Sequence, residues 1–452
     1  MVRKSQVAGR EAGIEIIRSP AIVLVKNLKG FISKNQHFGL TNKINLNSSI
    51  GTHPSIMKSL CIAFLICLTP SLCLAQKTAN QEEFDLFIKN LETEFIYYEQ
   101  KKEIIDCVKE TYRPHVDTVS QPYFKAIFYE LLLNELYDSH INLNTNTDRS
   151  YRLSSPVYVQ EKNGRFFITN VFSSQLEIDF PNVINAELLS FNGQPFDEAI
   201  RDFPTRCHDK NDPEIKEWLA NKVLAGKRNE PRKLLLKLSD GSQHNLDLDA
   251  LKFRQNNGLL TSSVDNNIGY IRINNSLSNQ DLVAAFNKAL DGMLGTEALI
   301  LDLRNTVGGG NTGVAEPIMG RFIDSQTGYQ VCENKDEKYT RFAFPNGAQY
   351  TRPVYVLVGR WTGSMGEGMA IGFDGMKRAT IVGTEMNRLA GGMKGIKFLN
   401  SNFQYRISFE KMYHLDGSLR ETFVPDEYVT QSSLKDEHLA YAMALIKKAD
   451  DR

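Results

Sequence analysis

The sequence lacks three features that would each indicate a particular function class. Its 53 basic and 53 acidic side chains cancel, so no excess charge favours nucleic acid or an anionic membrane surface as a partner. No apolar run of about 18 residues follows residue 75, so no transmembrane segment is expected in the mature chain. None of the six cysteines forms a C-x-x-C pair of the kind that binds metals. What remains is a composition of 42% hydrophobic residues over 452 positions, typical of a globular protein with room for two or three domains.

Residues 57–75 have the pattern of a secretory signal peptide. A charged start, an apolar core and a small-residue cleavage site stand in order at Met57-Lys58, Leu60–Leu68 and Cys73-Leu-Ala75, the last directly before Gln76. Signal peptides stand at the N-terminus, so we expect translation to begin at Met57 and residues 1–56 to be a disordered, non-native upstream extension. A short buried helix at 60–74 is the alternative. The chain is therefore predicted to be exported, to the periplasm or the extracellular space.

The cysteines indicate no disulfide framework. Cleavage would leave Cys107, Cys207 and Cys332, which are odd in number and far apart in sequence. We expect three separate buried thiols, with one bridge in an oxidising compartment as the alternative. Cys67 and Cys73 lack the preceding small residue that bacterial lipid attachment requires, so release is expected rather than anchoring.

The pattern of hydrophobic residues divides the mature chain into three regions. Residues 76–150 show helical spacing, with one helix predicted at about Tyr123–Tyr137. Residues 151–253 contain short strands and tight turns, and the run 185–200 resembles the strand–turn–helix segment of PDZ domains, which bind peptides at a sheet edge. A plain β-rich insertion is the alternative there. In residues 254–452 strands alternate with helices, which predicts a mainly parallel sheet with helices on its faces.

One serine stands where a strand turns into a helix. Val354–Val358 is an apolar strand, and Thr362-Gly-Ser-Met-Gly-Glu367 follows it and opens an apolar helix. Such a turn exposes its side chain at the edge of a sheet and directs helix N–H groups at whatever binds there, which suits a nucleophile at Ser364. The G-x-S-x-G pattern is only half matched, because Thr362 replaces the first glycine. A simple turn or cap residue is the competing interpretation.

A second glycine-rich turn follows another buried strand. Ala298-Leu-Ile-Leu-Asp302 leads into Gly308, Gly309 and Gly310, where the backbone can approach a ligand with its N–H groups. A phosphate-binding loop is disfavoured, because neither the P-loop ending nor the G-x-G-x-x-G spacing is present.

Four motifs in order resemble the C-terminal-processing (tail-specific) serine peptidases. They are Asp302-Leu-Arg-Asn-Thr-Val-Gly-Gly, Thr362-Gly-Ser-Met-Gly-Glu367, Ala379-Thr-Ile-Val-Gly383 and Val424-Pro-Asp426. The resemblance runs from about residue 80 to the end of the chain. It implies an α/β fold: a crotonase/Clp-protease-like ββα catalytic core at 254–452, with an N-terminal helical region at 76–150 and an inserted PDZ-like domain at 151–253.

The resemblance also discriminates between two catalytic arrangements. In the Ser–Lys branch a lysine follows the serine at the position that Leu389 occupies here, so that lysine is missing. The tricorn-like branch uses a serine before x-Gly-Glu, a distant histidine and a glutamate. Leu136-Tyr-Asp-Ser-His140 is similar to its histidine segment, although Ser139 replaces the usual glycine. Glu421 is the candidate glutamate, although it lies closer to Pro425 than in the family pattern.

The implied chemistry is acyl transfer. Ser364 would be the nucleophile, His140 its base and Glu421 the carboxylate that orients the imidazole. The N–H groups of Met365 and Gly309 would form the oxyanion hole. Peptides or proteins are the expected substrates, and no metal or organic cofactor is implied.

Further residues are expected to order this site. Gly308 and Gly310 would bind substrate or shape the loop. Asp302 and Arg304 would stabilise that loop through an ion pair, and Glu367 would cap its helix.

Two alternatives belong to other functional classes. An inactive peptide-binding relative is favoured if His140 or Glu421 lies more than about 6 Å from Ser364, beyond reach through one water. A crotonase-type acyl-CoA enzyme is disfavoured by the signal peptide.

Overall fold

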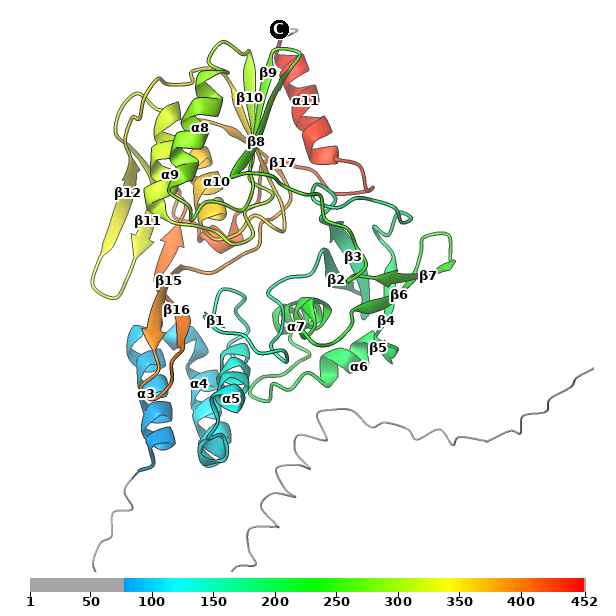
Figure 1. Ribbon diagram of the computed structural model, residues 1–452, viewed down its shortest axis with the longest axis vertical. Coiled ribbons are helices and arrows are strands. Elements are labelled where there is room, and N and C mark those ends of the chain that lie inside the picture. The colour runs from blue at the N-terminus through cyan, green and yellow to red at the C-terminus, as the bar shows by residue number, and fades with distance from the viewer. Residues whose placement is uncertain (1–76, 451–452) are drawn as a thin grey trace, which may run out of the picture. The chain divides into compact units, whose positions relative to one another are not determined.

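The computed structural model describes residues 77–450 (Figure 1). The signal peptide predicted at 57–75 and the extension predicted at 1–56 lie outside the described residues. Among the helices of residues 77–450, none combines the length and the hydropathy needed to cross a bilayer.

The first region is helical, as predicted from its spacing. It consists of α3 (Ala79–Glu94), α4 (Tyr98–Tyr112), the 3₁₀ helix η1 (Arg113–Thr118) and α5 (Pro122–Asn134). Thr78 begins α3 with a side chain that accepts from the N–H of Gln81. The prediction extended the last helix to Tyr137, but α5 ends three residues earlier. Tyr137 adopts a positive φ of 49°, which turns the chain into the segment carrying His140.

The second region is an antiparallel sheet with its own apolar core. Its elements are β2 (Val157–Lys162), β3 (Arg165–Val171), β4 (Glu187–Phe191), β5 (Gln194–Pro195), α6 (Phe196–Arg201), α7 (Pro213–Ala225), β6 (Lys233–Lys237) and β7 (Gln243–Asp247). The strand order is β2-β3-β4-β6-β7, so β2 lies at an edge. Helix α7 lies along that edge, where the Asn221 side chain bonds both the N–H and the C=O of Val159.

The third region contains a six-stranded sheet in the order β17-β14-β13-β10-β9-β8. Its strands are β8 (Leu260–Asp265), β9 (Ile268–Ile273), β10 (Ala298–Asp302), β13 (Val354–Val358), β14 (Thr380–Gly383) and β17 (Glu427–Tyr428). All neighbours pair in parallel except β8 with β9, so the predicted mainly parallel sheet is confirmed.

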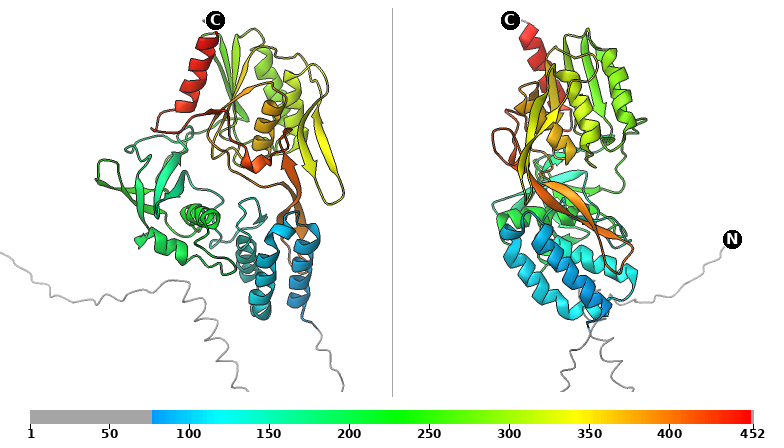
Figure 2. Two further views of the ribbon diagram at one scale, coloured as in Figure 1. Left: turned by 180° about the vertical axis from the view of Figure 1, so that it is seen from behind. Right: turned by 90° about the vertical axis from the view of Figure 1, so that its left-hand side faces the viewer.

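The central strands of this sheet are buried on both faces, which explains their continuous apolar runs. Leu299 and Leu301 of β10 pack with α8 (Asp281–Asp291), α9 (Thr312–Met319) and α10 (Met365–Gly375). The alternate residues Ala298 and Ile300 pack against α11 (Glu437–Asp450). Figure 2 shows α8 and α11 on opposite sides of the sheet. The site-bearing turn after β13 therefore projects from a rigid, doubly covered strand.

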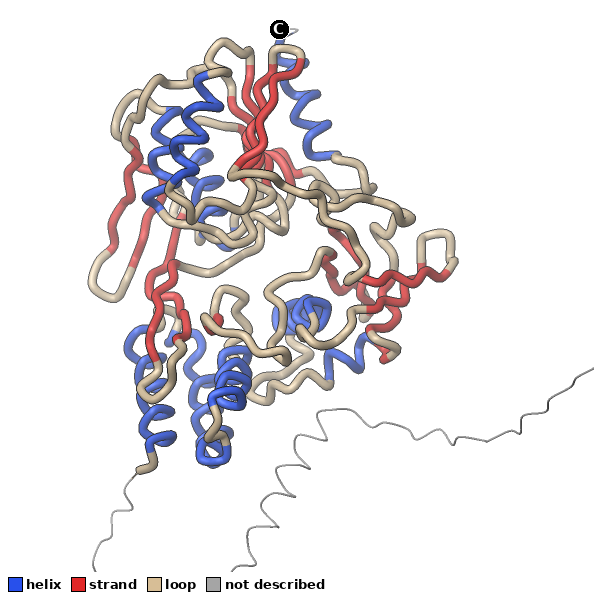
Figure 3. The backbone as a smooth tube through the Cα atoms, viewed as in Figure 1, coloured by secondary structure: helices blue, strands red, loops and turns tan. Residues whose placement is uncertain are grey.

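A further sheet joins the helical region to the rest of the chain. It contains β1 (Asn142–Leu143), β11 (Thr327–Glu333), β12 (Lys338–Ala343), β15 (Gly392–Lys397) and β16 (Gln404–Tyr413). Strands β15 and β16 pair antiparallel and form a long hairpin. Figure 3 shows this hairpin reaching the N-terminal helices, where Phe398 and Phe403 enter their apolar core. Pairing of Asn142 with Arg406 fixes the chain two residues after His140.

The prediction of three separate thiols is wrong. Cys107 of α4 is bonded to Cys207, which lies between α6 and α7, and the sulfurs join residues 100 positions apart. Only Cys332, which is buried, stays free among the cysteines of the described range. Sequence spacing could not reveal this pair, because the fold alone brings the two Cα atoms to 5.6 Å.

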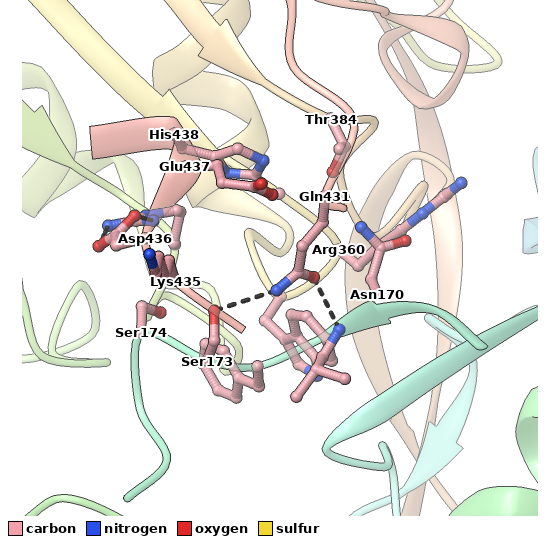
Figure 4. A pocket seen from close by; sticks show the side chains of 15 residues that line it. Asn170, Ser173, Ser174, Arg360, Thr384, Gln431, Lys435, Asp436, Glu437 and His438 are labelled. Carbon is pink, nitrogen blue, oxygen red and sulfur yellow. Dashed lines mark hydrogen bonds and ion pairs between the residues drawn. The ribbon is translucent and has the colours of Figure 1, made fainter. Parts of the chain in front are cut away.

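Figure 4 shows the contact between the end of β3 and the segment before α11. The Gln431 amide accepts from the N–H of Val171 at 2.8 Å and donates to Ser173 Oγ at 3.1 Å. The cavity enclosed there measures about 30 Å³, which is room for little more than one water molecule. This contact therefore joins two regions and is too small to be a substrate site.

Candidate active site

Ser364 sits in a strained turn at the start of α10. Its φ of 51° and ψ of −110° lie outside the regions that non-glycine residues favour. The turn is held in place by its backbone N–H, which donates to Glu367 Oε2 at 2.7 Å, and by close packing. A Cβ on Gly366 would lie only 2.1 Å from Thr306 Oγ1, so only glycine fits there. Glu367 caps the helix start, as predicted. Strain held by such surroundings is characteristic of functional turns.

His140 faces this serine from the segment after α5. Its Nε2 lies 3.1 Å from Ser364 Oγ, although the two residues are 224 positions apart in sequence. The backbone N–H of His140 donates to Asp138 Oδ1 at 2.8 Å, which fixes the turn before the ring. Burial, and secondarily the charge of Arg420, lowers the pKa of His140 to about 4. The imidazole is therefore neutral near pH 7, as a proton acceptor must be.

The other ring nitrogen of His140 contacts a backbone carbonyl. Nδ1 lies 3.0 Å from the oxygen of Ala390, which also accepts from Ser408 Oγ at 2.9 Å. Because a carbonyl can only accept, Nδ1 carries the proton and Nε2 presents its lone pair to Ser364. Sequence reasoning missed Ala390. A backbone acceptor leaves no side-chain signal in the sequence.

Glu421 does not make the predicted contact with His140. It lies on the 3₁₀ helix η3 (Arg420–Thr422), where its Oε1 accepts from Tyr97 Oη at 2.8 Å. Its buried Oε2 has no hydrogen-bond partner within the described residues. The physical reason is that the Ala390 carbonyl occupies the Nδ1 side of the ring. The orienting contact assigned to Glu421 is therefore corrected to Ala390.

The glycine loop lies against the serine, but its N–H groups are largely engaged. Gly309 has a φ of +62°, and a Cβ on it would lie 2.5 Å from Ser364 Cβ. Its N–H donates to the Thr306 carbonyl at 2.9 Å, and that of Gly308 donates to Asn275 Oδ1 at 2.6 Å. The predicted oxyanion donor Gly309 is therefore corrected: its N–H closes a turn. Gly310 packs against Leu277, where a Cβ would lie 2.3 Å from Leu277 Cβ.

The backbone N–H of Met365 is available beside the serine. As the first residue of α10 its N–H has no partner within the helix, and no other acceptor bonds it within residues 77–450. Met365 directly follows Ser364. A Cβ placed on Gly309 would lie 3.3 Å from the Met365 backbone nitrogen, so this N–H is close to the glycine loop. The N–H thus lies beside the serine at the positive end of a helix, which suits a developing negative charge.

The ion pair predicted beneath the glycine loop is present. Arg304 Nη2 lies 2.7 Å from Asp302 Oδ2, and both side chains are buried. Arg304 Nη1 also bonds Asp436 Oδ1 at 2.5 Å. Burial disfavours the charge of Arg304, but Asp302 and Asp436 outweigh it and hold the pKa of the guanidinium well above its usual range. This network joins the glycine loop to the segment before α11.

The second region contacts the nucleophile turn directly. Trp361, three residues before Ser364, stacks on Phe172 with ring centroids 4.5 Å apart. Its Nε1 donates to the carbonyl of Ser155 at 2.9 Å, and neighbouring Arg360 lies over the ring of Tyr158 at 4.5 Å. The edge strand β2 is thereby connected through a few contacts to the serine turn.

A cleft of about 680 Å³ is lined by Ser139 and Ala390, which adjoin His140, whereas neither His140 nor Ser364 lines it. It extends between α7, β2 and the segments around His140 and Ala390. Residues from these elements that line it include Ser139, Tyr158, Glu217, Asn221, Arg360 and Ala390. A cleft of this volume is large enough for several residues of an extended peptide.

Comparison with known proteins agrees with this arrangement. Residues 267–429 match peptidase family S41, and residues 152–259 match a PDZ domain. No curated protein sequence matches the chain. Among solved structures, mature CPAF is similar with a TM-score of 0.54 at 14% identity, covering 82% of this chain and 96% of that one. The photosystem II D1 C-terminal processing protease is similar with a TM-score of 0.52 at 13% identity, covering 81% and 97%.

At such identities the solved structures establish the fold, whereas the family match identifies the chemistry. The strand–turn–helix that carries Ser364 and the glycine loop both lie inside the matched residues 267–429. The β2–β7 sheet with α6 and α7 lies inside the PDZ match. Residues 267–429 therefore form a peptidase family S41 domain and residues 152–259 a PDZ domain, and the chain is a serine peptidase with the fold of the C-terminal-processing peptidases.

Proposed function

We propose that this peptidase hydrolyses peptide bonds of exported proteins or peptides through an acyl-enzyme on Ser364, with His140 as the base. The observation that supports this most is the 3.1 Å approach of His140 Nε2 to Ser364 Oγ. A serine hydroxyl is a weak nucleophile unless a base takes its proton during attack. His140 meets that need, because its proton resides on Nδ1 and its free lone pair faces the hydroxyl.

The reaction then proceeds in two halves. Ser364 Oγ attacks the scissile carbonyl carbon while its proton passes to His140 Nε2, and the Met365 N–H stabilises the oxyanion. His140 returns that proton to the leaving amine, which departs and leaves an ester on Ser364. Water next gives a proton to His140 and attacks the ester. Collapse of this second intermediate frees the carboxylic acid and returns the proton to Ser364.

A fluorophosphonate probe, which modifies serines only when they are activated, tests this assignment. The purified protein should be labelled stoichiometrically, whereas Ser364→Ala should not be labelled and His140→Gln should label far more slowly. Removing such a nucleophile or base lowers turnover by roughly 10⁶-fold. Ser150→Ala is the matched control, because this buried serine accepts from the N–H of Thr147 and lies away from the serine turn. Absence of labelling in folded wild-type protein would reject the proposal.

A peptide library would then identify the substrates. Incubation with the wild type and with Ser364→Ala, followed by mass spectrometry, gives the cuts that depend on the serine. We expect extended peptides to be cut, because Val157 and Tyr158 of the PDZ edge strand β2 line the cleft together with Ser139 and Ala390. If no peptide were cut in a serine-dependent way, while acyl-CoA thioesters in a parallel incubation were hydrolysed, the peptide assignment would be wrong.

Export is part of the same proposal. The disulfide between Cys107 and Cys207 supports it, because such bonds persist mainly outside the reducing cytoplasm. Expression from Met57 followed by N-terminal sequencing should give a mature chain that begins at Gln76, recovered from the periplasm or the medium. A chain that retains residues 57–75 and stays in the cytoplasm would contradict export.

A further inference from the structure

The segment Leu389–Gly391 holds the base and is itself held by a buried cation. The Ala390 carbonyl in its middle bonds His140 Nδ1. Arg420 Nη2 donates to the carbonyls on either side, that of Leu389 at 2.5 Å and that of Gly391 at 2.8 Å. Arg420 is only 2% exposed. A guanidinium that bonds both neighbours of a carbonyl fixes the direction in which that carbonyl points.

The same segment is connected to the nucleophile by a buried carboxyl group. Glu367 accepts from the N–H of Ser364 through Oε2 at 2.7 Å and from the N–H of Leu389 through Oε1 at 3.2 Å. Its side chain is completely buried. One carboxylate therefore spans the backbone of the nucleophile and the backbone that orients the base. A helix cap alone would need only the first of these contacts.

We propose that Glu367 and Arg420 are positioning residues that fix the Ala390 carbonyl and thereby the orientation and tautomer of His140 relative to Ser364. This inference rests on the proposed function, in which His140 is the base. It assigns to two buried charges and a backbone carbonyl the orienting task that the sequence had suggested for the carboxylate of Glu421. Burial raises the pKa of Glu367 to about 7, and the nearby charge of Arg420 opposes that rise.

The arrangement has a chemical reason. A neutral imidazole can take the serine proton on Nε2 only if Nδ1–H has an acceptor on its far side. A loop carbonyl can fulfil this only if its loop cannot turn away. Glu367 and Arg420 prevent that by bonding one N–H and two C=O groups within three residues. If the contacts of Glu367 or of Arg420 are lost, the Ala390 carbonyl can rotate. The His140 ring can then turn so that Nε2 no longer points at Ser364 Oγ.

Matched variants can separate positioning from ordinary stabilisation. Glu367→Gln keeps the shape but replaces one acceptor oxygen by a donor, and Arg420→Lys keeps the charge but loses the two-carbonyl fork. The controls are Glu83→Gln, a buried carboxylate that accepts from the N–H of Asn400, and Arg321→Lys, a buried guanidinium that donates to the Ala348 carbonyl. Both controls perturb equally buried charges away from the serine turn.

Three readouts are needed: the fluorophosphonate labelling rate, kcat and KM on a peptide found in the library, and the ¹⁵N and ¹H resonances of the His140 ring. We expect Glu367→Gln and Arg420→Lys to lower labelling and kcat by roughly 10²-fold, the effect of misplacing a catalytic group by about 1 Å, with KM nearly unchanged. The Nδ1–H signal should shift or broaden in both. The controls should lower the melting temperature comparably and leave the rate and the signal unchanged.

The outcomes are distinguishable. If the wild type is labelled but the folded site variants react like their controls, the positioning role is wrong and the proposed function stands. If the wild type is not labelled, the proposed function fails, and the His140 resonances still show whether the two residues set the tautomer. If Glu367→Gln fails to fold, Arg420→Lys still tests whether the orientation of the Ala390 carbonyl matters, through the other positioning residue. An unchanged His140 signal in every folded site variant overturns the inference.

Discussion

The titration of His140 provides the sharpest test of the site. Burial, followed by the charge of Arg420, lowers its pKa from 6.5 to about 4. This corresponds to about 3 kcal/mol of free energy against the charged form, at about 1.4 kcal/mol per pKa unit. At pH 5.5 His140 should be about 97% neutral, whereas an unperturbed histidine would be only about 9% neutral.

The pH dependence of the free energy of unfolding would not reveal this shift in the pKa of His140. Because the pKa of His140 is lower in the folded chain, the neutral ring contributes stability that is complete above pH 6.5 and lost as the pH falls towards 4. Burial raises the pKa of Glu367 from 4.5 to about 7, so its contribution is complete below pH 4.5 and lost as the pH rises through 7. Between about pH 4 and pH 7 the contributions of His140 and Glu367 to the free energy of unfolding therefore change in opposite directions.

A site-resolved NMR titration of ¹³C-labelled histidine is therefore the appropriate assay. The His140 signal, assigned by its absence in His140→Gln, should begin to shift only below about pH 5. This assignment matters because burial also lowers the pKa of His438 to about 4. A His140 midpoint near pH 6.5 would show that the ring is solvated and would refute the buried geometry of the site.

Three further predictions concern residues around the site. Gly309→Ala should nearly abolish phosphonate labelling while the protein stays folded, because the new Cβ would lie 2.5 Å from Ser364 Cβ at a φ of +62°; labelling at the wild-type rate would contradict this. Trp361→Phe should lower the free energy of unfolding by about 1 kcal/mol, since it keeps the stacking but loses the bond to Ser155, as chemical denaturation would measure. Cys107→Ser should cost about 2–4 kcal/mol of stability, and the same loss on reducing the wild type would be the check.

The sequence was informative where local patterns determine the structure. The apolar run Val354–Val358 could be buried only within a covered parallel sheet, and the structure places it there as β13. The small residues after it had to form a turn, which holds Ser364 half-buried at the start of α10. The family motifs suggested His140, which local pattern alone could not, because 224 positions separate it from the serine.

The sequence was least informative where the backbone supplies the polar group. Ala390 acts through its carbonyl, and an alanine gives no sign of such a role. The N–H of Gly309 is directed by a turn to the Thr306 carbonyl, which the three glycines do not specify. Glu421 was chosen as the nearest glutamate before Pro425, but its neighbour Arg420 is the residue that contacts the Ala390 segment.

The acceptor on His140 has opposing consequences for catalysis. Burial and the charge of Arg420 lower the pKa of His140 to about 4, and the hydrogen bond to the Ala390 carbonyl offsets only part of this decrease, so the base is weak. That weakness represents about 3 kcal/mol of proton affinity, but only part of it reaches the transition state, where the proton is partly transferred. Misplacing the base by about 1 Å would cost roughly 10²-fold, or about 2.7 kcal/mol, and all of it would reach the rate. A rigidly held weak base can therefore match a stronger one that is free to turn. For this reason the contacts of Glu367 and Arg420 around Ala390 should matter more to this peptidase than the basicity of its histidine.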